Sequence, residues 1–85
     1  MDRTRLEEAI AAVDRQIAMG DTQIVDAYDN LAMLVRNGRD YREALGYLDV
    51  LEDTQIAHTR RRDQLLEQLR RTPEPIFRRY LDDVI

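Results

Sequence analysis

The chain has 85 residues, of which 35% are charged, and it carries a net charge of −4 with no cysteine. A domain this short has a thin hydrophobic core, and without cysteine it has neither a disulfide framework nor thiol chemistry. Its single histidine, His58, has no second histidine beside it, so we expect no metal ion and no cofactor. The remaining way to stabilise such a chain is a partner protein or self-association.

A catalytic function is not expected. The chain contains no serine and no cysteine, and its three glycines form no phosphate-binding loop. We therefore name no catalytic residue and predict that the protein is not an enzyme.

A membrane location is not expected either. No uninterrupted apolar run is longer than that of residues 31–35, which is far too short to span a bilayer. The N-terminal residues are followed by no apolar segment typical of a signal peptide. The absence of cysteine suits a reducing compartment, and we expect the protein to be cytoplasmic.

The first predicted helix begins at the capping-box pattern Thr4 to Glu7 and ends near Met19. Gly20 can adopt a left-handed backbone conformation, which favours a helix end. The apolar stripe of this helix is Leu6, Ile10, Val13 and Ile17.

Two further helices are predicted on either side of a turn at Asn37–Gly38. The helix before the turn starts at Asp21 or Thr22, and the helix after it starts at Asp40, with Glu43 three residues later. Their apolar stripes are Ile24, Tyr28, Leu31, Leu34 and Val35, and then Tyr41, Ala44, Leu45, Leu48 and Leu51.

The apolar pattern fails in residues 52–63, and two interpretations compete there. One is a single helix of about 30 residues from Tyr41 to Arg71, roughly 45 Å long. The other is a break near Asp53–Thr54. We favour the break because Asp53–Ile56 repeats the sequence of Asp21–Ile24 at a spacing close to that of helical-hairpin arrays.

The C-terminal part predicts further helix. Leu65, Leu66 and Leu69 resume an apolar stripe, Thr72–Pro73 has the pattern of a helix start, and a short last helix follows over residues 76–84. The fold class predicted is all-α, with four or five short helices packed as antiparallel hairpins. We expect one domain, 1–85, made of an N-terminal helix at 1–20, a hairpin at 22–52 and C-terminal helices at 54–85.

Residues 25–51 resemble a tetratricopeptide repeat. In the first helix the match rests on an aromatic residue, a leucine and a small residue, which are Tyr28, Leu31 and Ala32. In the second helix it rests on an aromatic residue, a small residue and two later packing positions, which are Tyr41, Ala44, Leu48 and Leu51. Gly38 lies one residue earlier than the usual turn glycine of the family. Any tight antiparallel helix pair needs some of the same residues, so a generic hairpin remains an alternative to homology.

The resemblance implies a scaffold that binds a peptide or helix along the exposed side of the first helix of the repeat. The corresponding partner-binding residues are Asp26, Asp29, Asn30, Met33, Arg36 and Asn37. Because methionine is adaptable and carboxylates attract cations, this surface favours a basic or amphipathic helix. The function we expect is a small protein-interaction module, an adaptor or chaperone-like subunit.

Arginines dominate the C-terminal part of the chain. Residues 1–59 have a net charge of −6 and residues 60–85 a net charge of +2. The possible basic contact residues are Arg60, Arg61, Arg62, Arg70 and Arg71. The alternative function is a regulatory protein of antitoxin or phage type whose arginines engage an acidic protein surface or nucleic acid. Nucleic acid is the less favoured of these partners because the whole chain is acidic.

Overall fold

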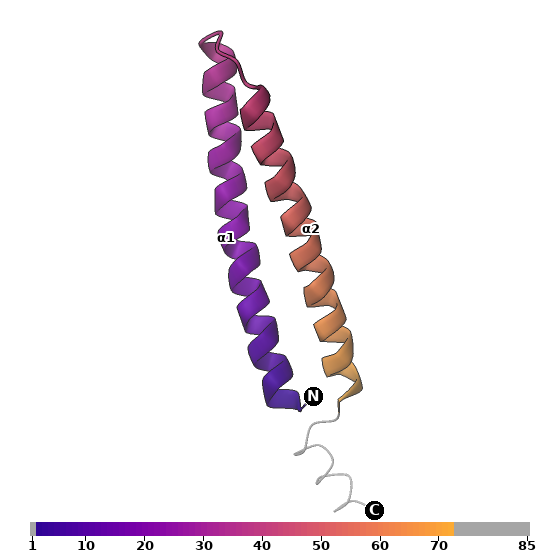
Figure 1. Ribbon diagram of the computed structural model, residues 1–85. Helices are drawn as coiled ribbons and strands as arrows, with labels where there is room; N and C mark the ends of the chain where they lie inside the picture. Colours follow the sequence, from indigo (N-terminus) through magenta and orange to yellow (C-terminus); the bar gives the residue numbers. More distant parts are fainter. Residues whose placement is uncertain (1, 73–85) are drawn as a thin grey trace, which may run out of the picture.

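The computed structural model describes residues 2–72, which form two long helices, α1 (Arg3–Arg36) and α2 (Arg42–Arg71), joined by a turn at residues 37–41. The helices run antiparallel and side by side, so that the start of α1 lies beside the end of α2 (Figure 1). At 1.5 Å per residue they are about 50 Å and 45 Å long. The described part is therefore one helical hairpin without strands.

Helix α1 begins two residues earlier than the capping box at Thr4 predicts. Asp2 is the N-cap, and its Oδ1 accepts a hydrogen bond from the backbone N–H of Arg5 at 3.0 Å. Aspartate is as good an N-cap as threonine and satisfies one of the unpaired amides of the first turn. Thr4 is consequently inside the helix, and its predicted capping role is wrong.

The turn at Asn37–Gly38 is confirmed, and it ends α1 by a specific hydrogen-bond pattern. Gly38 has φ of 66° and donates its N–H to the carbonyl of Val35, while the N–H of Arg39 bonds to the carbonyl of Leu34. This pair of bonds is a Schellman motif, in which the left-handed residue is usually glycine. The predicted cap at Asp40 with Glu43 is wrong by one residue, because the N-cap of α2 is Tyr41, which makes no side-chain cap hydrogen bond. Asp40 lies just before it, and its Oδ1 accepts from the N–H of Arg42 at 3.1 Å.

Two glycines give opposite expectations for alanine substitution. Gly38→Ala should lower the free energy of unfolding by about 1 kcal/mol, because alanine is strained at positive φ. Gly46→Ala should raise it by roughly 0.5–1 kcal/mol, because Gly46 lies inside α2 and an added Cβ would meet nothing within 4 Å. Urea titration of both variants checks the pair. Equal effects at the two glycines would contradict the role of Gly38 in the turn.

The surface between the helices, which we call the seam, follows an alternating spacing of four and three residues. In α1 it consists of Leu6, Ile10, Val13, Ile17, Gly20, Ile24, Ala27, Leu31 and Leu34. In α2 and its C-cap Thr72 it consists of Ala44, Leu48, Leu51, Gln55, His58, Arg62, Leu65, Leu69 and Thr72 itself. All are buried or half-buried. This is the spacing of a coiled coil, in which both helices keep one stripe towards the partner.

The seam is apolar at its two ends. Leu6, Val13 and Leu65 form a buried cluster near the N-terminus, and Ala27 and Leu48 are buried nearer the turn. Among the described residues no polar or charged side chain is fully buried. The core therefore consists of two apolar ends with a different middle.

The middle of the seam is polar on the α2 side. The side chain of Gln55 lies over Gly20, where a Cβ would overlap its amide. Its Nε2 donates to the carbonyl of Ile17 at 2.7 Å and to Oδ1 of Asp21 at 2.6 Å. One and two turns further along α2, His58 Nδ1 and Arg62 Nε are buried without a hydrogen-bond partner in the described part of the chain. Such polar positions fix the register of paired helices at a cost in stability.

Two predicted helix boundaries are wrong, so residues 2–72 form two long helices in place of the short ones expected there. Gly20 does not end a helix, because α1 continues through it. Since Gly20 has no side chain, the amide of Gln55 fits against its backbone. The favoured break at Asp53–Thr54 is absent, and α2 is continuous over residues 42–71. The other interpretation, one helix of about 30 residues, agrees with the structure. Thr72, predicted to cap a last helix, is the C-cap of α2, and its hydroxyl donates to the carbonyl of Gln68 at 2.9 Å. Pro73 and the last helix predicted at 76–84 lie outside the described residues.

Candidate partner-binding surfaces

The outer surface of α1 faces away from α2 and carries most of the predicted partner-binding residues. Asp26, Asp29, Met33 and Arg36 are all exposed, and their spacing of three or four residues places them on one stripe. Met19 extends this stripe by two turns, since it lies two heptads before Met33. These two methionines are 64% and 51% exposed. We call this surface the outer face of α1.

Asn30 and Asn37 lie elsewhere. Asn30 lines two shallow grooves beside Tyr47, on one open side of the hairpin where the helices meet. Asn37 is the C-cap of α1, and its N–H bonds to the carbonyl of Met33. The structure thus brings four of the six predicted residues together and separates these two.

The open side that contains Asn30 is polar. At intervals of seven residues it presents exposed side chains from both helices, and we call it the amide face. Its residues are Gln16, Gln23, Asn30, Thr54, Arg61 and Gln68. Tyr47 lies at its turn end.

The opposite open side presents a surface that the sequence analysis missed. It holds six large apolar side chains that are 40–58% exposed, and we call it the apolar face. Its residues are Val25, Tyr28, Val35, Leu45, Ile56 and Leu66. Each of the other residues lies at a helical spacing of 3, 4, 7 or 14 residues from Tyr28 or Glu52, and those two side chains join across this side of the hairpin. The exposed carboxylates of Asp14, Asp21 and Asp49 lie on the same side at the same spacings.

A hydrogen bond between Tyr28 and Glu52 connects the two helices on the apolar face. The Tyr28 hydroxyl donates to Oε1 of Glu52 at 2.8 Å. This hydrogen bond and the nearby negative charge raise the pKa of the Tyr28 phenol above its ordinary value. Beside the pair lies a groove with mainly apolar walls, lined by Ile24, Glu52, Gln55, Ile56, Thr59 and Arg60.

The signal for the apolar face was present in the sequence. Tyr28, Val35 and Leu45 were assigned to the stripes that pack within the hairpin. Because a helix turns 100° per residue, a stripe that includes both Leu34 and Val35, or both Ala44 and Leu45, is wider than one helix–helix seam needs. The excess width indicates a second contact surface.

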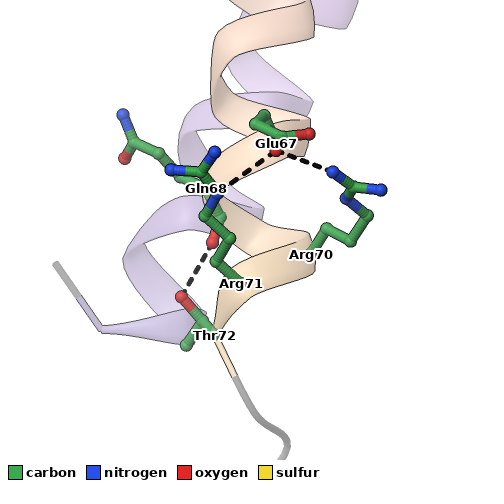
Figure 2. A network of polar contacts seen from close by, with 5 residues as sticks. All are labelled: Glu67, Gln68, Arg70, Arg71 and Thr72. Carbon is green, nitrogen blue, oxygen red and sulfur yellow. Dashed lines mark hydrogen bonds and ion pairs between the residues drawn. The ribbon is translucent and has the colours of Figure 1, made fainter.

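The predicted basic residues do not form one patch. Arg62 lies in the seam, with its Nη1 3.5 Å from Oδ1 of Asp14. Arg70 and Arg71 both approach Oε1 of Glu67, at 2.7 and 3.2 Å (Figure 2), and the hydrogen bond from Arg70 lowers the pKa of that carboxyl. Arg60 lines the groove of the apolar face, whereas Arg61 lies on the amide face.

The described residues contain no group of three or more His, Asp or Glu side chains suited to hold a metal ion. Neither described helix combines the length and the apolar character needed to cross a membrane.

Comparison of the chain with family models, with curated proteins and with solved structures finds no match.

Proposed function

We propose that the protein is a small protein-interaction module, an adaptor or chaperone-like subunit, that binds a basic amphipathic helix of a partner on the outer face of α1. The observation that carries the proposal is the exposure of Met19 and Met33 on a stripe with Asp26 and Asp29. Within the described residues no ion pair engages either carboxylate, and neither methionine belongs to the core.

The chemistry of this stripe suits such a ligand. Methionine side chains are flexible and adapt to differently shaped apolar residues. Carboxylates on the same surface attract cations and disfavour an acidic competitor. The resemblance of residues 25–51 to a tetratricopeptide repeat remains a prediction, and it implies binding along the same side of α1.

The alternative, binding of nucleic acid through arginines, has less support. Three of the five candidate arginines, Arg62, Arg70 and Arg71, are engaged in ion pairs. Each such pair lowers the positive potential that phosphates would meet. A protein partner is therefore the function we put forward.

The test uses a synthetic amphipathic helix with a leucine stripe and an arginine-rich polar face, titrated into the isotopically labelled full chain. We expect chemical-shift changes along the outer face of α1. The double substitution Asp26→Lys and Asp29→Lys should weaken binding about tenfold. The same charge change on α2, Asp49→Lys with Asp53→Lys, serves as the matched control and should have a smaller effect.

Two results would contradict the proposal. One is equal binding of a peptide in which glutamates replace the arginines. The other is binding that is insensitive to the substitutions at Asp26 and Asp29 but sensitive to those on α2.

A further inference from the structure

We propose that a groove beside Tyr47 binds the guanidinium group of an arginine from the partner's helix. This inference rests on the proposed function and deepens it, because it names the partner side chain that decides which basic helices bind. The groove lies where the amide face adjoins the outer face of α1, and we call it the Tyr47 groove. Its lining residues are Gln23, Asp26, Ala27, Asn30, Ala44 and Tyr47.

Small side chains in the seam form the floor of the Tyr47 groove. Ala27 is 6% exposed and Ala44 is half-buried. Because an alanine side chain ends at Cβ, the helices leave a hollow of about 200 Å³ at this level. Binding sites for small molecules enclose roughly 300–1,000 Å³. The hollow is therefore of a size for a single side chain of a partner.

The aromatic ring of Tyr47 forms one wall of the groove. This side chain is 56% exposed, so its ring is accessible to a ligand. A guanidinium group is planar and weakly hydrated, and it stacks on an aromatic ring with a favourable cation–π interaction. The ammonium group of lysine is more strongly hydrated and has no plane to stack. The ring therefore favours arginine over lysine.

A carboxylate and two amides supply the hydrogen-bond acceptors. Asp26 is exposed, and no ion pair within the described residues engages it. A carboxylate accepts two parallel hydrogen bonds from one guanidinium group. The side-chain carbonyls of Gln23 and Asn30 can accept the remaining N–H groups. The described residues that line the groove include no cation, so none of them repels an arginine.

A second groove shares Asn30, Ala44 and Tyr47 with the first and contains Asp40. The carboxylate of Asp40 is already bonded to the chain's own Arg42, whose Nη2 lies 3.0 Å from Oδ2 and whose Nε lies 3.2 Å from Oδ1. None of the residues that line this groove belongs to the outer face of α1.

Asp26 belongs both to the outer face of α1 and to the Tyr47 groove. A helix that lies along the outer face therefore has this groove at its edge, within reach of a long arginine side chain. The Tyr47 groove is for this reason the one that we assign to the partner.

The first experiment titrates N-acetyl-arginine amide into the isotopically labelled full chain. The side-chain amides of Gln23 and Asn30 give signals of their own, and we expect both to shift. N-acetyl-lysine amide at the same concentration should shift them only about a third as far. Tyr47→Leu should abolish this difference. Tyr28→Leu is the matched control, since Tyr28 is 51% exposed but lies on the apolar face, and it should leave the shifts unchanged.

The second experiment uses the arginine-rich amphipathic peptide and a version with lysine at every arginine position, which has the same charge. We expect calorimetry to show about threefold tighter binding of the arginine peptide. Tyr47→Leu should remove this preference, and Tyr47→Phe should keep it, because phenylalanine retains the ring. Far-UV circular dichroism verifies that each variant is as helical as the original chain.

Each outcome decides the inference. Equal shifts with the two amides and equal affinities of the two peptides overturn it. It is also overturned by shifts at Leu34 and Glu43 without a shift at Gln23, because Leu34 and Glu43 line only the second groove. An arginine preference that Tyr28→Leu removes and Tyr47→Leu keeps has the same consequence.

Failure of this inference is distinguishable from failure of the proposed function. If the peptides bind along the outer face of α1 but neither probe shifts the signals of Gln23 and Asn30, only this inference fails. If the arginine amide shifts those signals but the arginine peptide does not bind, the groove remains an arginine site and the proposed function fails.

Discussion

Leu65→Ala is expected to destabilise the hairpin by about 3 kcal/mol, within the range of roughly 2–5 kcal/mol for leucine deletions in protein cores. Leu65 is only 2% exposed and packs in one cluster with Leu6 and Val13. Since the described hairpin has few buried side chains, there is little neighbouring structure to collapse into the space left behind. We expect loss of most far-UV helical signal at 37 °C and a large decrease in the urea midpoint.

Met19→Ala serves as the control for this prediction. It also shortens a large apolar side chain on a helix, but Met19 is 64% exposed. It should change the free energy of unfolding by less than about 0.5 kcal/mol. Both variants must be compared at the same protein concentration, because any self-association adds to the apparent stability. A similar loss for both variants would contradict the placement of the core.

Replacing the polar middle of the seam should stabilise the hairpin. In the double variant His58→Leu with Arg62→Leu, two buried nitrogens that lack partners are removed and two apolar side chains enter the seam. Removing an unsatisfied buried polar atom is worth about 1–3 kcal/mol. The ion pair from Arg62 to Asp14 is half-exposed and contributes little. We expect a gain of about 2–4 kcal/mol in the free energy of unfolding.

The control is the double variant Arg61→Leu with Gln64→Leu, which adds the same apolar residues at exposed positions of the same helix. It should leave the stability within about 0.5 kcal/mol of the original chain. Urea titration and thermal melts of both variants measure the difference. If the seam variant were no more stable than the surface control, His58 and Arg62 would not lie between the helices.

Local chemistry was sufficient to predict the turn. Gly38 takes the one backbone conformation that other residues avoid, and Asp40 offers an acceptor to the first amide of α2. Both effects act within a few residues, so they can be recognised without knowledge of the rest of the fold. Four residues of the outer face of α1, Asp26, Asp29, Met33 and Arg36, were expected only from the resemblance to a tetratricopeptide repeat, and Met19 was not expected.

The continuity of α1 depended on a residue far away in sequence. Gly20 has the features of a helix end, and only the position of Gln55 shows that its missing side chain makes room for a contact across the seam. One feature of the sequence did indicate a continuous helix: the apolar stripe that begins at Leu6 keeps its alternating spacing of four and three residues through Gly20 to Leu34. That pattern would have outweighed the local propensity of one glycine.

By itself the sequence determined that the described part of this protein is helical and where its chain reverses. Periodicity, capping and glycine chemistry decide these features over a few residues. Only the tertiary structure decided that residues 52–63 continue one helix and that one open side of the hairpin is apolar. The physical reason is that a polar residue in a seam, or an apolar residue on a surface, is placed by the neighbouring helix and not by its own propensity.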